Sequence, residues 1–130
     1  MPETNVIIMI KNHATGILEE ELCTCKIASN AELLENIFAV RNGESVMINV
    51  CLSTESDVED WEYEALFDYY DTDILGLTEM TGRHNPVWVA EFPFVDSEDA
   101  EAVISSLLSA HRDELSAVFE EIKDKKEDYL

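Results

Sequence analysis

Positively charged side chains are scarce in this chain. Only eight lysines and arginines face 29 aspartates and glutamates, which gives a formal net charge of −21. A surface of this sign repels phosphate backbones and anionic lipid head groups. We therefore expect no direct binding to nucleic acid and none to a membrane.

Long hydrophobic runs are also missing. The longest uninterrupted apolar stretch, residues 6–10, is five residues long, whereas a membrane-spanning helix needs about 18 or more. The residues before it, Met1 to Asn5, carry no basic region and do not read as a secretory leader. The sequence therefore predicts a soluble, cytoplasmic protein.

Cysteines and glycines are too few for the sites that they commonly build. Three cysteines, Cys23, Cys25 and Cys51, are an odd number and indicate free thiols in a reducing compartment. Zinc sites use wider pairs in turns, but Cys23 and Cys25 are two residues apart in a predicted strand, where packing explains them, so we expect no metal. The four glycines are scattered, which leaves no phosphate-cradling loop and no expected cofactor.

What is present suits one folded domain. A chain of 130 residues, 46% of them apolar, can bury a core without a disulfide or a metal. Patterning and turn signals predict three β-hairpins. Their strands are residues 6–12 and 17–28 around the turn Ala14-Thr15-Gly16, residues 36–41 and 45–52 around Asn42-Gly43, and residues 74–80 and 87–94. Asn42-Gly43 is the strongest of these signals, because both residues tolerate the positive φ of a type I′ turn.

Two segments have helical patterns. A capping box, Ser56-x-x-Glu59, predicts a helix over residues 57–70. Residues 97–125 lack glycine and proline and carry an apolar stripe at helical spacing. The order of elements predicts an α+β fold, with a mostly antiparallel sheet of about six strands and two helices, one long and C-terminal, covering one face.

The three histidines differ in how well they suit a role in ligand binding or acid-base chemistry. His13 falls in the first turn and His111 on the stripe of the last helix, where a histidine at the boundary of the core is expected. The loop Arg83-His84-Asn85 is the better candidate, because it offers a cation, an acid or base and an amide together. We expect it to bind a small ligand if the chain has such a site, with Trp61, Tyr63 or Trp88 as a pocket wall.

The sequence contains neither of two common catalytic motifs and only an incomplete metal-binding pattern. Neither G-x-S-x-G nor H-E-x-x-H occurs, so the sequence favours no enzyme class. Asp68, Asp71 and Asp73 could collect a hard cation, but Leu75 breaks the EF-hand spacing. Solvated charge at the end of a helix is the simpler reading of these aspartates.

The last helix suggests an interface. About 29 residues at 1.5 Å each reach roughly 43 Å, longer than the ~30 Å width of a small domain. We therefore expect Val118, Phe119 and Ile122 to lie near or past the sheet edge, where a homodimer or a protein partner would cover them. The alternative is a bend near residues 111–113 that folds the end back.

Three functions remain open from the sequence. The leading one is a non-enzymatic interaction or regulatory domain, because catalytic motifs are missing. The second is an acidic decoy, a nucleic-acid mimic that binds a basic protein. The third is a small-ligand-binding domain or an enzyme that uses the Arg83-His84-Asn85 loop.

Overall fold

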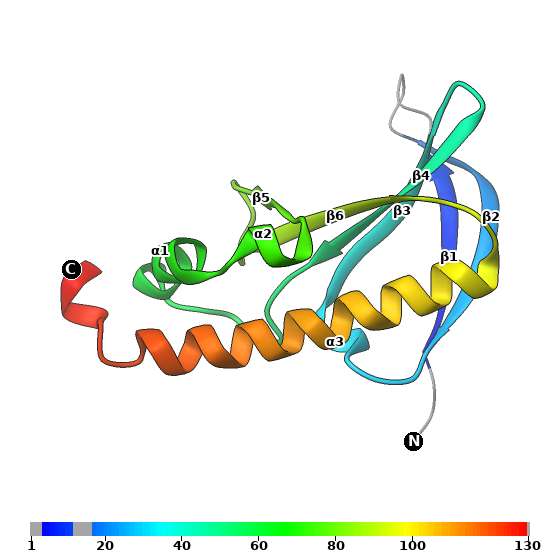
Figure 1. Cartoon of the computed structure of the whole chain (residues 1–130). Coiled ribbons are helices and arrows are strands. Elements are labelled where there is room, and N and C mark those ends of the chain that lie inside the picture. Colours follow the sequence, from blue (N-terminus) through cyan, green and yellow to red (C-terminus); the bar gives the residue numbers. More distant parts are fainter. Residues whose placement is uncertain (1–3, 12–16, 130) are drawn as a thin grey trace.

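One six-stranded sheet, crossed on one side by a long helix, organises the chain (Figure 1). The structure, a computed structural model, describes residues 4–11 and 17–129. In chain order the elements are β1 (Thr4–Lys11), β2 (Leu18–Ile27), the 3-10 turn η1 (Ala31–Leu33), β3 (Leu34–Asn42), β4 (Ser45–Leu52), α1 (Asp60–Tyr69), α2 (Thr72–Leu75), β5 (Thr78–Met80), β6 (Val87–Pro93), α3 (Ser97–Ile122) and the 3-10 turn η2 (Lys126–Tyr129).

The sheet is mixed but mostly antiparallel. Its strand order is β2-β1-β3-β4-β6-β5. Each of the three hairpins pairs in antiparallel fashion, and β6 pairs with β4 in the same way, whereas β1 runs parallel to β3 over a short stretch. The predicted fold class is therefore confirmed. The turn Ala14-Thr15-Gly16 and His13 lie outside the described residues.

The hairpin of β3 and β4 is confirmed, but its turn is one residue later than predicted. Asn42 pairs with Ser45 and so belongs to the strand. Gly43 and Glu44 form the turn, and Gly43 adopts the positive φ of 64° that a side chain would resist. The asparagine is not needed in a left-handed conformation here.

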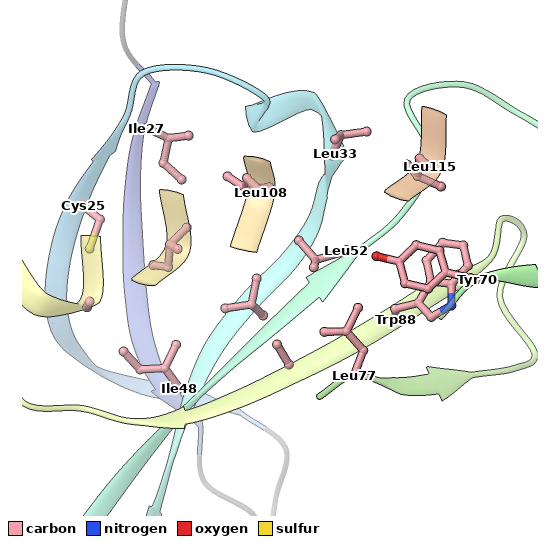
Figure 2. Packing of buried hydrophobic residues seen from close by; sticks show 14 of the residues in the cluster. Cys25, Ile27, Leu33, Ile48, Leu52, Tyr70, Leu77, Trp88, Leu108 and Leu115 are labelled. Carbon is pink, nitrogen blue, oxygen red and sulfur yellow. The ribbon is translucent and has the colours of Figure 1, made fainter. Parts of the chain in front are cut away.

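The core lies between the sheet and the helices. Along β4 the predicted alternation is confirmed, because Ile48, Val50 and Leu52 are fully buried on the side of α3. Figure 2 shows Leu108 and Leu115 of α3 over this inner face of the sheet. The buried side chains of α3 recur at helical spacing, and they are Ala100, Ile104, Leu108, His111, Leu115, Val118 and Ile122.

The first helix begins later than the sequence predicts. Glu59, not Ser56, caps α1, and Glu62 completes the capping box. The backbone nitrogens that Ser56 would cap have other partners, because Val58 N donates to Asn85 Oδ1 and Glu59 N donates to Glu62 Oε1. A contact with a distant loop therefore overrides a local capping signal.

The predicted strand 74–80 is also wrong in its first half. Residues from Thr72 to Leu75 form the short helix α2, and only Thr78–Met80 form β5. The Asp71 side chain accepts from the backbone of Asp73 at the start of this turn, and Gly76 ends it in the left-handed conformation. Two local caps outweigh the strand-like pattern.

The last helix is continuous. It runs from Ser97 to Ile122 without the bend considered near residues 111–113, ends before Lys125 and is followed by η2. Asp96 caps its start by accepting from the backbone of Asp99. In the described part of the chain, no helix combines the length and the apolarity that crossing a membrane requires.

Candidate functional site

The loop between β5 and β6, which is the ligand-binding candidate from the sequence, borders an open pocket. Arg83, His84 and Asn85 form one wall of a hollow of about 370 Å³. The other walls come from the start of β3, with Glu32 and Glu35, and from the end of β4. These residues from three separate segments meet because β3, β4 and β6 are neighbours in the sheet.

Two residues of the loop form a clasp with the segment before α1. Asp57 Oδ1 accepts from Asn85 Nδ2 at 3.1 Å and lies 3.3 Å from His84 Nε2. Asn85 Oδ1 in turn accepts from the backbone nitrogen of Val58 at 3.3 Å. The hydrogen bond from Asn85, followed by the contacts of His84, holds the pKa of Asp57 below its ordinary value. His84 thus has an acidic partner that sequence reasoning did not identify.

The remaining polar groups of the pocket also have partners within the chain. Arg83 lies 3.8 Å from Glu35. Ser53 Oγ donates to the carbonyl of Pro86 at 2.7 Å, and Thr54 Oγ1 donates to the carbonyl of Ser56. The pocket therefore presents side chains that already hold one another in place.

The aromatic residues suggested as a pocket wall lie elsewhere. Trp88 is fully buried in the core, stacked on Tyr70 with ring centroids 4.3 Å apart (Figure 2). Trp61 packs beside Tyr129 of η2, and Tyr63 beside Phe67 on α1. The lining of the pocket, as far as the described residues show, contains none of the three.

A buried histidine links both helices to the sheet. His111 is completely buried, not at the boundary of the core as expected. Its Nε2 lies 2.8 Å from the carbonyl oxygen of Ser53, and its Nδ1 lies 2.7 Å from the hydroxyl of Tyr70. A carbonyl can only accept, so Nε2 must carry the proton, and the tyrosine donates to Nδ1.

Burial keeps these two groups neutral. It lowers the pKa of His111 to about 4, with Arg112 adding to the effect and the hydrogen bond to Ser53 opposing it. Burial also raises the pKa of Tyr70, with a smaller contribution from Glu114. Both ring nitrogens of the neutral His111 side chain are hydrogen-bonded inside the core. The residue therefore has a structural role and is not placed to act as an exposed acid or base.

The candidate metal-binding groups are dispersed or occupied. Cys23, Cys25 and Cys51 are all buried as free thiols, and burial raises the pKa of Cys25 to about 12. Among the described residues, no three His, Cys, Asp or Glu side chains gather as metal ligands do.

The aspartate string at the end of α1 is used within the chain. Asp68 accepts from the hydroxyl of Tyr129 at 2.8 Å, and Asp71 caps α2 through the backbone of Asp73. These contacts give Asp68 and Asp71 structural roles, as partners of η2 and α2.

The end of α3 is covered by the chain itself. Val118 and Ile122 are buried, and Phe119 is half-buried against the core. From the sequence we expected these side chains to lie near or past the sheet edge. In the structure, α1 packs against α3 at this end. The three side chains therefore need no second copy to shield them, and their role in an interface stays a prediction.

The feature that sequence reasoning missed is the other side of the sheet. We call outer face the side turned away from α1 and α3. The strand register places six apolar side chains from four strands on this face: Ile7, Met9, Phe38, Val40, Met47 and Val89. Ile7 is 56% exposed, and the other five are half-buried. The signal was available, because residues 6–10 are apolar at every position, whereas a strand with one wet face alternates.

Comparison with known proteins adds a family but no function. The family model described as a family of unknown function, DUF6762, matches residues 1–130. No curated protein and no solved structure matches the chain. Since the match extends over the full length of the sequence, this acidic α+β chain belongs to the DUF6762 family.

Proposed function

We propose that the chain is a non-enzymatic interaction domain that binds another protein surface through the outer face of its sheet. The observation that carries the proposal is the set of apolar side chains on that face. They are contributed by β1, β3, β4 and β6, which are adjacent in the sheet, so they form one surface. Apolar patches of this kind on a domain with a complete core elsewhere mark interaction sites.

The core does not account for this surface. Helices α1 and α3 bury the opposite side of each strand, where Ile8, Ala39 and Ile48 are fully enclosed. Within the described residues the outer face is covered only in part: Cys51 is buried there, and the Lys11 ammonium lies 4.6 Å from the centroid of the Phe38 ring. Its apolar area is available to a partner without any rearrangement of the fold.

The Arg83-His84-Asn85 loop supports the ligand-binding alternative less well. A ligand that used Asn85 would compete with the clasp to Asp57 and Val58, and one that used Arg83 would compete with Glu35. Sites built for small ligands keep a few polar groups free to converge on the ligand. The pocket is therefore better explained by the contacts that anchor the loop to Asp57, Val58 and Glu35 than by a ligand.

The decoy alternative also lacks a matching surface on α3. A nucleic-acid mimic needs carboxylates at regular intervals along one face. Between the exposed carboxylates of Asp99 and Asp113, the exposed positions of α3 carry the uncharged side chains of Ala102, Ser105, Ser106 and Ser109. This spacing weighs against a continuous phosphate-like ridge.

Oxidative footprinting can test the proposal, because the outer face carries methionines and a phenylalanine that react readily with hydroxyl radicals. The purified chain, tagged and dilute, is exposed to radicals in buffer and in an extract of the cells that produce it. We expect oxidation of Met9 and Met47 to fall severalfold in the extract. Tyr69, which is 41% exposed on α1, is the internal control and should stay unchanged.

The two sides of the molecule then give opposite readouts. Protection of Met9 and Met47 with Tyr69 unaffected supports binding at the outer face. Equal oxidation of these methionines in buffer and in extract would refute the proposal. Protection of Tyr69 alone would move the interaction to the helical side and refute it too.

A further inference from the structure

The charge on the outer face differs from that of the whole chain. By strand register, Lys11 and Lys26 lie on this face together with Glu21 and Glu91. The ion pair between Arg83 and Glu35 adds no net charge beside it. The outer face is therefore close to neutral, in a chain whose formal net charge is −21.

The negative charge is concentrated elsewhere. Residues 55–73, which lead into and form α1 and α2, contain four glutamates and five aspartates and no lysine or arginine. A strongly basic partner would be drawn to this helical side rather than to the outer face. The near-neutral apolar face is instead the surface on which two copies of so acidic a chain repel each other least.

The two ends of the outer face also complement each other. Ile7 projects from β1, next to the edge strand β2, and is the most exposed of the six side chains. At the opposite edge, β4, β5 and β6 border an open hollow of about 400 Å³, whose lining includes Met80 and Val89 together with the polar side chains of Asn49, Thr78, Glu79 and Glu91. A two-fold axis parallel to the strands places Ile7 of each copy over the hollow of the other, as a closed symmetric interface requires.

From these observations we infer that the occupant of the outer face is a second copy of this chain, packed sheet against sheet around a two-fold axis. The inference rests on the proposed function and names its partner. Two sheets that pack face to face lie about 10 Å apart. This arrangement covers the apolar side chains of both outer faces and leaves both helical sides, with their carboxylates, in contact with solvent.

Light scattering on the full chain tests the inference. In about 0.15 M sodium chloride, where the Debye length is roughly 8 Å, we expect a mass near twice the 14.7 kDa of one chain as concentration rises. Ile7→Glu places a charge on the exposed tip of the face and should raise the dissociation constant at least about tenfold. Ser109→Glu adds the same charge to the exposed side of α3 and should leave the dimer intact.

A second variant guards against an indirect effect of the first. Met47→Glu places a charge on β4, one of the two middle strands of the sheet, and should also weaken the dimer, with circular dichroism showing that both variants stay folded. A monomer at every concentration overturns the inference. So does a dimer that Ile7→Glu and Met47→Glu leave unchanged, or one that only Phe119→Asp disrupts, because that places the interface at the end of α3.

The footprinting readout separates this inference from the proposed function. In the purified protein, oxidation of Met9 and Met47 should fall as concentration rises, and Tyr69 should not respond. If the purified chain stays monomeric but the extract still protects these methionines, the second copy is ruled out and the interaction domain stands. If neither condition protects them, both are refuted.

Discussion

The hydroxyl of Tyr70 donates to Nδ1 of His111 across the contact between the end of α1 and the middle of α3. Because Nε2 of the same ring donates to the carbonyl of Ser53, the imidazole is held in a single tautomer. A protonated ring would present a hydrogen at Nδ1 to a hydroxyl that already donates there. The contact therefore favours the neutral histidine by its geometry as well as by its burial.

The stability of the chain should depend on pH through His111. Its pKa is about 4 when folded, below the ordinary value of 6.5, so the unfolded state binds the proton first. The stabilisation by the neutral ring is complete above pH 6.5 and is lost as the pH falls toward 4. By pH 4 this loss amounts to about 3 kcal/mol.

Urea denaturation of the wild type and of His111→Gln at several pH values isolates this effect, because carboxylate protonation is common to both proteins. We expect the wild type to lose about 3 kcal/mol relative to the variant between pH 7.5 and pH 4. Parallel stability curves would mean that the ring is already accessible to protons in the folded state.

The loop clasp should depend on Asn85 more than on His84. Asn85→Ala removes a donor to Asp57 and an acceptor for Val58, and should cost about 1–2 kcal/mol of unfolding free energy. His84→Ala removes a side chain that is 80% exposed and should change it by less than about 0.5 kcal/mol. In Asn85→Ala the pKa of Asp57, followed by NMR titration, should rise toward its ordinary value. The reverse order of the two variants would contradict the clasp.

Gly76 should be required for its conformation alone. Its φ is 66°, and a Cβ built there meets nothing within 4 Å. Gly76→Ala should therefore destabilise the chain by about 1–2 kcal/mol through backbone strain. Gly76→Asn should cost less, since asparagine tolerates the left-handed region better. Thermal denaturation of both variants makes the comparison, and equal losses would point to a steric cause instead.

Salt should stabilise the folded chain. Packing a net charge of −21 into one domain raises repulsion on folding, and salt screens it with a Debye length near 10 Å at about 0.1 M. The melting temperature should rise with sodium chloride at a fixed, low protein concentration. A flat or falling melting temperature would show that ion pairs such as those of Arg112 with Glu32 and Glu55 outweigh the repulsion.

The hairpins could be predicted because their signals are local. The turn at Gly43 and the alternation of Ile48, Val50 and Leu52 can be recognised from residues that are close together in the sequence. The start of α1 could not be predicted in this way, since the backbone nitrogen of Val58 donates to Asn85, 27 residues further along the chain. Whether a local cap forms there depends on tertiary structure, which a sequence pattern does not contain.

The candidate loop was predictable in its position but not in its partners. Three polar residues in a turn suggested the site at Arg83, His84 and Asn85, and the pocket lies beside them. Their pairing with Asp57 and Glu35 depends on how the strands are ordered in the sheet. The outer face could be predicted only in part, because the apolar run of residues 6–10 indicates one strand with two apolar sides, but the strand order is needed to show which residues of other strands share that surface.

The position of α3 has a consequence for biosynthesis. The helix leaves the ribosome after all six strands, yet it closes the core over the first hairpin, with Ser97 beside Cys25 and Arg112 bound to Asn30. Until it has emerged, the nascent sheet exposes two apolar faces to the cell instead of one. Chains that stall before Ser97 should be clients of chaperones or proteases, while chains from which α3 has emerged can close their core.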